Sequence, residues 1–242
     1  MANTFRSKLF VDARDLSPDI TRCRWPQDSE MLESHGIDAG DKAFVAGLAH
    51  GGEVTVELLF NNATLGSSFL GDDIALTKQL IYGPNLDTIG QEAVVVNGSV
   101  FRTHERSHGR NELVAVSAGF QLSEDVNDGL FLADSAARTS DGALATTHDN
   151  AASSSAGILA WLQVLDITDM TSLVVIVEMD TVSGFTSPTT LITFSTVTNG
   201  NEPVTEEKET SGSVERYTRV KLTFNSPGGS PSVKVVVATR RK

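Results

Sequence analysis

The sequence predicts an all-β protein with one short helix, arranged as two consecutive β domains. The first observation is the segment Glu53–Phe60, in which valine, leucine and phenylalanine occupy every second position and polar residues the positions between. A period of two marks a strand with one buried and one wetted face. The second observation is that similar short runs recur along the chain, separated by glycine, proline and other turn-forming residues. This pattern is typical of sandwiches and jelly rolls.

In the first half, the same reasoning predicts four strands, at Phe5–Val11, Glu53–Phe60, Glu92–Thr103 and Glu112–Leu122. The last two are separated by the polar segment HERSHGRN, and we expect them to form a hairpin with a long loop.

The predicted helix covers residues 72–82. Asp72 or Asp73 can cap its first turn, Leu76 and Leu80 fall on one helical face, and Gly83-Pro84 would end it.

The composition changes at Asp134–Ser155, a segment rich in Ala, Ser, Thr, Asp and Asn that is typical of a linker. We therefore place a domain boundary near residue 150, with one domain at 1–150 and a second at 151–242. The second is predicted to be another β-sandwich, jelly-roll-like, with the acidic run Asn199–Gly212 as its longest loop. Its expected strands are Gly157–Val164, Leu173–Met179, Leu191–Val197, Tyr217–Phe224 and Pro231–Ala238.

Length, net charge and cysteine content exclude several classes of function. With 242 residues, of which 40% are hydrophobic, the chain can bury a substantial core. A net charge of −12 argues against gripping nucleic acid, which requires clustered Lys and Arg. The single cysteine, Cys23, excludes an internal disulfide or a cysteine-based zinc cluster. The first residues lack a secretory signal, and no apolar run is long enough to cross a bilayer, so we expect synthesis and folding in the cytoplasm.

Two groups of residues have some of the features of a metal-binding site. His104 and His108 flank a hairpin turn, but no cysteine accompanies them, and the interpretation as solvated turn residues is favoured. Asp125, Asn127, Asp128 and Gly129 resemble part of a calcium loop without its final bidentate glutamate, so a polar turn is expected there. No nucleotide-binding, nucleophile or zinc-protease motif is present. We therefore predict no catalytic, cofactor-binding or metal-ligating residue, and no enzymatic activity.

Four aromatic residues raise the possibility of a sugar-binding platform: Trp25, Trp161, Phe185 and Tyr217. Trp161, however, falls within a strand pattern, where packing in the core is the commoner role.

The first 132 or so residues resemble the major tail protein of siphovirus-type phages, the subunit of their long, non-contractile tail tube. The resemblance begins with a DLSP turn at Asp15–Pro18 and continues with FVAGL at Phe44–Leu48, where the family often has F/Y-I/V-P-G-L. This sequence has Ala46 in place of the proline. A Gly51-Gly52 step then opens a strand that ends in VELLF, and VNDGLFL at Val126–Leu132 resembles the closing segment GVDRGVLL.

The last 85 residues or so are similar to a β-sandwich appended to some tail proteins of this kind. Ala156–Val164 and Glu215–Phe224 carry that likeness.

The resemblance implies a tail-tube-type β-sandwich or barrel with one packed helix, followed by a sandwich on the outer surface of the tube. Such subunits form rings, usually hexameric, that stack into a conduit for the genome, and segments such as Gln27–Asp41 would order on stacking. The implied partners are further copies of the chain, the tape measure, the tail terminator and the distal tail protein. Viral DNA would pass without specific binding, and the implied location is the virion tail.

Two other functions stay open from sequence. One is a different virion part, either a head decoration protein or a head–tail joining protein, and the other is a carbohydrate-binding module formed by the second domain. Ring symmetry is also open, because three subunits would complete a ring of pseudo-sixfold symmetry if the two domains were diverged copies. We favour six subunits, because the halves share no detectable repeat.

Overall fold

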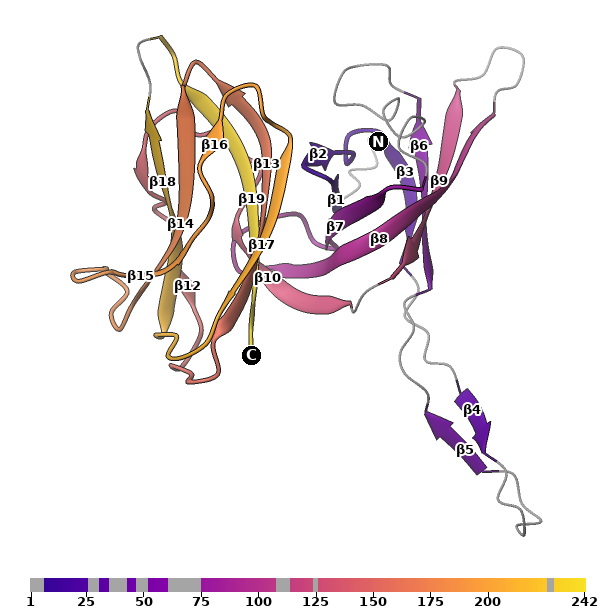
Figure 1. Cartoon of the computed structure of the whole chain (residues 1–242), viewed down its shortest axis with the longest axis horizontal. Helices are drawn as coiled ribbons and strands as arrows, with labels where there is room; N and C mark the ends of the chain where they lie inside the picture. Colours follow the sequence, from indigo (N-terminus) through magenta and orange to yellow (C-terminus); the bar gives the residue numbers. More distant parts are fainter. Residues whose placement is uncertain are drawn as a thin grey trace, which may run out of the picture. The chain divides into compact units, whose positions relative to one another are not determined.

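The computed structural model describes residues 7–25, 31–34, 43–46, 52–60, 75–107, 114–123, 126–225 and 229–242. Within these ranges the chain forms β-strands and connecting segments, and no helix (Figure 1). The predicted all-β class is therefore confirmed.

The described strands, in chain order, are β1 (Lys8–Val11), β2 (Arg14–Asp15), β3 (Ile20–Arg24), β4 (Met31–Ser34), β5 (Ala43–Ala46), β6 (Glu53–Leu59), β7 (Thr77–Gly83), β8 (Glu92–Ser107), β9 (Ala115–Leu122), β10 (Asn127–Ala133), β11 (Gly142–Ala143), β12 (His148–Asp149), β13 (Ile158–Thr168), β14 (Ser172–Asp180), β15 (Thr189–Thr193), β16 (Val197–Thr198), β17 (Val204–Thr210), β18 (Tyr217–Asn225) and β19 (Ser232–Arg241). Strands β6, β10, β13, β14 and β19 each run antiparallel to every described strand with which they pair.

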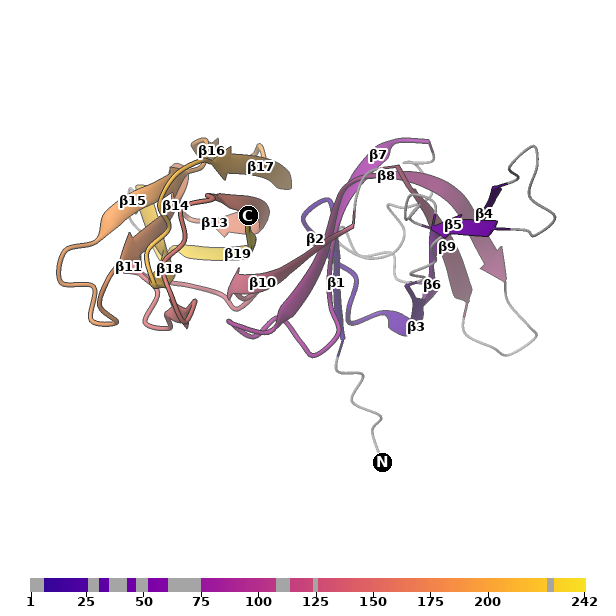
Figure 2. The same ribbon diagram turned by 90° about the horizontal axis from the view of Figure 1, so that it is seen from below.

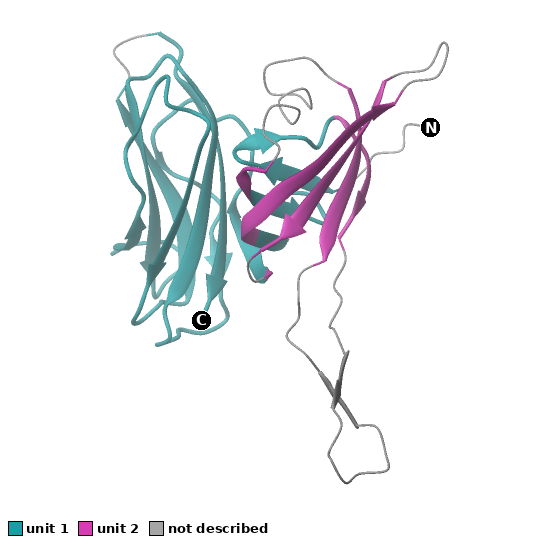
Figure 3. Cartoon of the chain, turned by 45° about the vertical axis from the view of Figure 1, so that its right-hand side comes forward, with its two compact units in different colours: residues 1–18, 79–95, 127–242 teal, residues 19–78, 96–126 magenta. Residues whose placement is uncertain are grey.

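The strands belong to two compact units that interleave along the sequence (Figure 3). Unit 1 contains residues 1–18, 79–95 and 127–242, and unit 2 contains residues 19–78 and 96–126. The chain passes from one unit to the other within β7 and within β8. The boundary expected near residue 150 stays a prediction.

Unit 1 contains a sandwich of two sheets (Figure 2). One sheet has the strand order β17-β13-β19-β10, and the other has β18 and β14 at its centre. Alternate residues of β13 fill the space between them, namely Ile158, Ala160, Leu162 and Val164. They meet aliphatic residues of β14, β18 and β19 that are almost fully buried.

A second core covers the other face of β13 and β19. Trp161 and Leu165 of β13 and Val236 of β19 pack there with Phe10 of β1 and Ile81 of β7. Strands β13 and β19 are therefore buried on both faces. Strands from the start of the chain supply this second layer, so residues far apart in sequence share one core.

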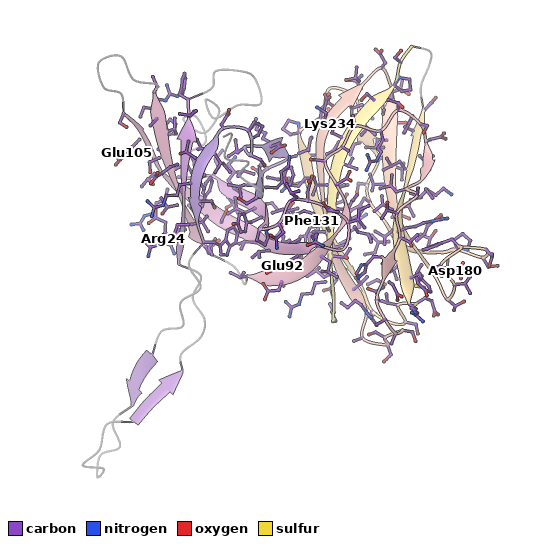
Figure 4. The ribbon with its side chains drawn as sticks, turned by 180° about the vertical axis from the view of Figure 1, so that it is seen from behind. Arg24, Glu92, Glu105, Phe131, Asp180 and Lys234 are labelled. Atoms are coloured by element: carbon purple, nitrogen blue, oxygen red, sulfur yellow. The ribbon has the colours of Figure 1, made fainter. Side chains whose placement is uncertain are left out.

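Unit 2 contains the strand order β3-β6-β9 followed by the second part of β8. Its buried face carries Val54, Val56 and Leu58 of β6 and Phe120 of β9, all 1% exposed or less. The opposite face is polar, as the alternation in Glu53–Phe60 predicts. Arg24 and Glu105 mark two strands of this sheet in Figure 4.

Strands β4 and β5 form a separate two-stranded sheet, with Met31 opposite Ala46 and Ser34 opposite Ala43. Among the described strands they pair only with each other. Part of the predicted FVAGL segment therefore lies in β5, and its last residues lie outside the described ranges.

The predicted helix at 72–82 is wrong over its described part, because residues 77–83 form β7. This strand pairs with β1, with Leu80 opposite Val11 and Tyr82 opposite Leu9. Residues 78 to 81 are consecutively buried, which removes the alternation that marks a half-wetted strand. Pairing and two-sided burial outweigh the local capping and spacing signals. The predicted first residues of the helix lie outside the described ranges.

The acidic run Asn199–Gly212 was predicted to be a loop, and this prediction is also wrong. Residues 204–210 form β17, which pairs along its length with β13, from Val204 opposite Val164 to Thr210 opposite Ile158. The predicted linker Asp134–Ser155 carries the short strands β11 and β12, both paired with β18. Charged or small residues conceal strands that lie at sheet edges, where burial is partial.

Candidate functional site

The residues that were weighed as metal ligands and set aside do not form a cluster among the described residues. His104 lies in β8, half-buried, with its ring 6.3 Å from that of Phe101 in an edge-on arrangement, and His108 lies outside the described ranges. Asp128 and Gly129 lie in β10, paired with β8, rather than in a turn, and Asp125 is outside the described ranges. In the part of the chain that the structure describes, no group of three or more His, Cys, Asp or Glu side chains is placed to hold a metal ion.

The four candidate aromatic residues do not form one platform. Trp161 is fully buried in unit 1, and its Nε1 donates a hydrogen bond of 2.6 Å to Glu207 Oε2. Phe185 is 7% exposed, with the guanidinium carbon of Arg219 4.0 Å from its ring centroid. Tyr217 is half-buried beside Arg216, and Trp25 belongs to unit 2. A flat sugar-binding surface needs exposed rings, so the residues present do not support this use.

Arg219, which lies over the ring of Phe185, belongs to a charged network on the sheet that contains β14 and β18. Glu178, 5% exposed, accepts hydrogen bonds from Arg219 Nε at 3.0 Å and a second guanidinium nitrogen at 2.8 Å. Lys221 Nζ lies 3.4 Å from the other carboxylate oxygen. The buried carboxylate is thus paired on both oxygens, as burial of a charge requires. Through the contact of Arg219 with Phe185, the network also holds the β14–β15 loop against the sheet.

The carboxylate of Asp180 organises the same loop. It accepts hydrogen bonds from the backbone nitrogens of Ser187 (3.0 Å) and Val182 (3.1 Å). The bond from Ser187, followed by that from Val182, lowers the pKa of Asp180 although burial opposes the shift. Asp180 therefore stays ionised and acts as a structural clamp (Figure 4).

A shallow cleft of about 370 Å³ is lined by Ile89 and by the segment from Arg138 to Thr146. Arg138, its one cationic group, forms an ion pair with Asp134. The remaining lining combines Asp141 and the hydroxyls of Ser140 and Thr146 with apolar side chains, and these lining residues include no histidine, cysteine or lysine.

The features suited to assembly are the open sheet edges. Strand β3 pairs with β6 and, among the described strands, with no other. Arg22 and Arg24 are exposed on the wetted face of this edge, opposite Glu57 and Thr55 of β6. Cys23 points to the core side opposite Val56, and burial raises the pKa of its thiol to about 11, so it stays protonated at neutral pH.

Strand β17 is the second open edge, paired only with β13 among the described strands. Glu207 and Glu209 are exposed, and the side chain of Glu209 retains 63% of its exposure beside Lys242. Glu206 and Lys208 point to the other face, where they bond to Ser195 and to the carbonyl of Thr193. Sequence reasoning missed this edge because four charged residues in a row resemble a loop. The available signal was the pair Val204-Thr205, which favours a strand.

No protein-family model matches the chain, and no curated protein matches its sequence. The solved structures that are similar to this chain include two from phages. One is the Dit protein (gp 19.1) of phage SPP1, described as a paradigm of the hub adsorption apparatus in phages that infect Gram-positive bacteria. It has 13% identity and a TM-score of 0.36, with 98% of this chain and 99% of that chain covered.

The other is the baseplate of phage P2 in its activated conformation with Ca, at 10% identity and a TM-score of 0.37, with 98% of each chain covered. Both TM-scores lie below 0.5, so neither likeness carries an argument about fold or function. Within the described residues, the structure contains no helix that is long and apolar enough to span a membrane.

Proposed function

We propose that this chain is a structural, non-enzymatic subunit of a phage tail that assembles with copies of itself into rings, and that the rings stack into a tail tube. The observation that carries the proposal is the pair of open, oppositely charged strand edges in an all-β chain. An unpaired edge offers a row of backbone donors and acceptors to another chain. Edges of different composition favour head-to-tail contacts, which close into rings.

The sequence resemblance to major tail proteins supports the same function. It supplies the finer details of the proposal: six copies in a ring, assembly in the host cytoplasm, and contact with the tape measure, tail terminator and distal tail proteins. The net charge of −12 suits a conduit whose wall does not bind DNA, since like charge repels phosphate. Placement of residues 151–242 on the outer tube surface stays part of the proposal.

The β4–β5 hairpin is a second feature suited to assembly. It lies within and beside Gln27–Asp41, the segment for which the sequence predicts ordering on stacking. A two-stranded hairpin alone is marginally stable in water. We propose that it is stabilised by contact with a neighbouring ring.

The proposal is tested by concentrating the purified full chain and examining it by sedimentation velocity and negative-stain electron microscopy. We expect rings or hollow rods whose amount rises with protein concentration. A monomer at every concentration, including in the presence of the partner tail proteins, would overturn the proposal. Discrete trimers that bind empty capsids would instead assign the chain to the head.

A further inference from the structure

We propose that the ring contact joins β3 of one copy to β17 of the next, so that two sheet edges pair across the interface. This inference rests on the proposed function and names the surfaces that perform it. The occupant of each edge is therefore a second copy of this chain, in a head-to-tail arrangement.

The charges of the two edges are complementary. The exposed side chains of β3 include Arg22 and Arg24, with 70% of the Arg22 side chain accessible. The exposed face of β17 carries Glu207 and Glu209, of which Glu207 also accepts the hydrogen bond from Trp161 and Glu209 forms an exposed ion pair with Lys242. In both strands the two charged residues are separated by one position, so they project from the same face with the same spacing. Paired strands would therefore place arginine near glutamate at two successive positions.

The same charges disfavour pairing of like edges. A contact of β3 with β3 would bring arginines together, and a contact of β17 with β17 would bring glutamates together. Like charges directly opposite each other destabilise a strand pair. Both symmetric dimers are thus penalised, while the mixed contact is favoured, and specificity of this kind arises from repulsion as well as attraction. A mixed contact leaves one edge of each type free to continue the ring.

The β3 edge also has space for an incoming side chain. A shallow cleft of about 130 Å³ is lined by Arg22, Arg24, Thr55 and Glu57. Within it, the nearest guanidinium nitrogen of Arg22 is 3.7 Å from Glu57, and both side chains are more than half exposed. Such an exposed pair is weak. A carboxylate from β17 of a neighbour would therefore find two arginines available to bind it, at little cost to the existing pair.

The β3 edge also has features that limit unselective pairing with other strands. The register of β3 shifts between Ile20 and Arg22, and Thr21 Oγ bonds to the carbonyl of Glu57. An irregularity of this kind, together with charged side chains, protects an edge from unselective pairing. The edge is thus short and charged, and it accepts a partner strand of opposite charge in preference to others.

The test is a charge swap in the full chain. R22E/R24E and E207K/E209K each place like charges across the proposed contact, and we expect each to raise the concentration needed for half-assembly at least tenfold in sedimentation velocity. The quadruple variant restores opposite charges, and we expect its assembly to return to within about threefold of the original. E207Q/E209Q keeps an oxygen acceptor for Trp161 and should show an intermediate loss.

The matched control is R102E/K234E, which makes the same change in net charge as R22E/R24E at exposed positions on the inner strands β8 and β19. Circular dichroism of every variant confirms that it is folded. The inference is overturned if the original chain assembles and the control impairs assembly as much as R22E/R24E does. It is equally overturned if folded double variants assemble normally, or if the quadruple variant is no better than the doubles. Failure of the original chain to assemble would instead overturn the proposed function.

Discussion

The central strands of the two units differ in how many of their faces are buried. In unit 1, a core covers each face of β13 and β19. One core contains residues of β14 and β18, and the other contains Phe10 and Ile81 together with Trp161 of β13 itself. In unit 2, β6 and β9 bury one face and wet the other. The same type of secondary structure therefore tolerates very different side chains in the two places, because a polar side chain on a doubly buried strand must find its partners inside the protein.

Gln163 shows this requirement. It is fully buried on β13, its Oε1 accepts a hydrogen bond from Ala13 N at 2.9 Å, and its Nε2 donates to Gln79 Oε1 at 3.0 Å. Asp12 and Ala13 form the two-residue turn between β1 and β2, with φ of 45° and 58°. Left-handed φ values at both positions are typical of a type I′ turn; aspartate tolerates this region, whereas alanine is strained in it. The buried amide holds this turn against the sandwich.

The largest expected effect follows from changing one glutamine in each unit. Gln163→Leu removes the acceptor of the Ala13 N–H and the donor to Gln79 Oε1, and it should lower the free energy of unfolding by about 2–4 kcal/mol. Gln121→Leu, on the half-wetted strand β9, should change it by no more than about 0.5 kcal/mol. Urea unfolding followed by tryptophan fluorescence measures both. Equal effects of the two substitutions would show that two-sided burial is not the distinguishing feature.

A smaller difference is expected for alanine at one glycine in each unit. A Cβ on Gly83 of β7 would lie 2.5 Å from the backbone oxygen of Leu86 and 2.7 Å from the ring of Phe131. Neither atom can move freely, so Gly83→Ala should cost about 1–3 kcal/mol. At Gly119 of β9 the Cβ would meet the ends of the Glu53 and Thr103 side chains, which can rotate away on a wetted face.

Gly119→Ala should therefore be within about 0.5 kcal/mol of neutral, because the loss of unfolded-chain entropy offsets the small adjustment. Thermal unfolding of both variants provides the comparison. A cost at Gly119 equal to that at Gly83 would contradict the distinction between a free and an enclosed face.

The difference between the units also explains what the sequence predicts correctly. Alternation identified β6 and β9 closely, since one face of each is wetted and every second residue is polar or small. It failed at β7, where Lys78 and Gln79 are buried beside Leu80 and Ile81, so the helical spacing of two leucines was the strongest remaining pattern. It failed again at β17, whose charged residues occupy an edge.

The interleaved units were beyond sequence reasoning for a related reason. Phe10 and Ile81 carry no mark of the partner against which they pack, and that partner includes Trp161, about 80 residues or more further along the chain. The change in composition near residue 150 reports the local polarity of a segment, and the boundary placed there stays a prediction. The same limit applied to the candidate site, because an edge is defined by the absence of a neighbouring strand.

The smallest expected effect concerns the polar periphery of unit 1, which should respond to acid before its doubly buried core. The pKa of Asp180 is lowered by the bond from Ser187, and the pKa of Asp149 is lowered to about 2, chiefly by its hydrogen bonds to Arg216. A carboxylate with a lowered pKa stabilises the fold above its unfolded-state pKa, near 4, and the stabilisation is lost as the pH falls from there towards 2.

Hydrogen exchange between pH 5 and pH 2.5, corrected for the intrinsic rate, measures this loss residue by residue. We expect protection of the Val182 and Ser187 amides to fall first, while the amides of β13 and β19 keep theirs, since apolar side chains fill the cores on both faces of these strands. Asp180→Asn should reduce the protection of the loop at pH 7 and remove most of its dependence on acid. Simultaneous loss of protection in the loop and in β13 would show that the periphery and the doubly buried sheet open as one cooperative unit, and the contrast between them would then lie only in burial and not in local stability.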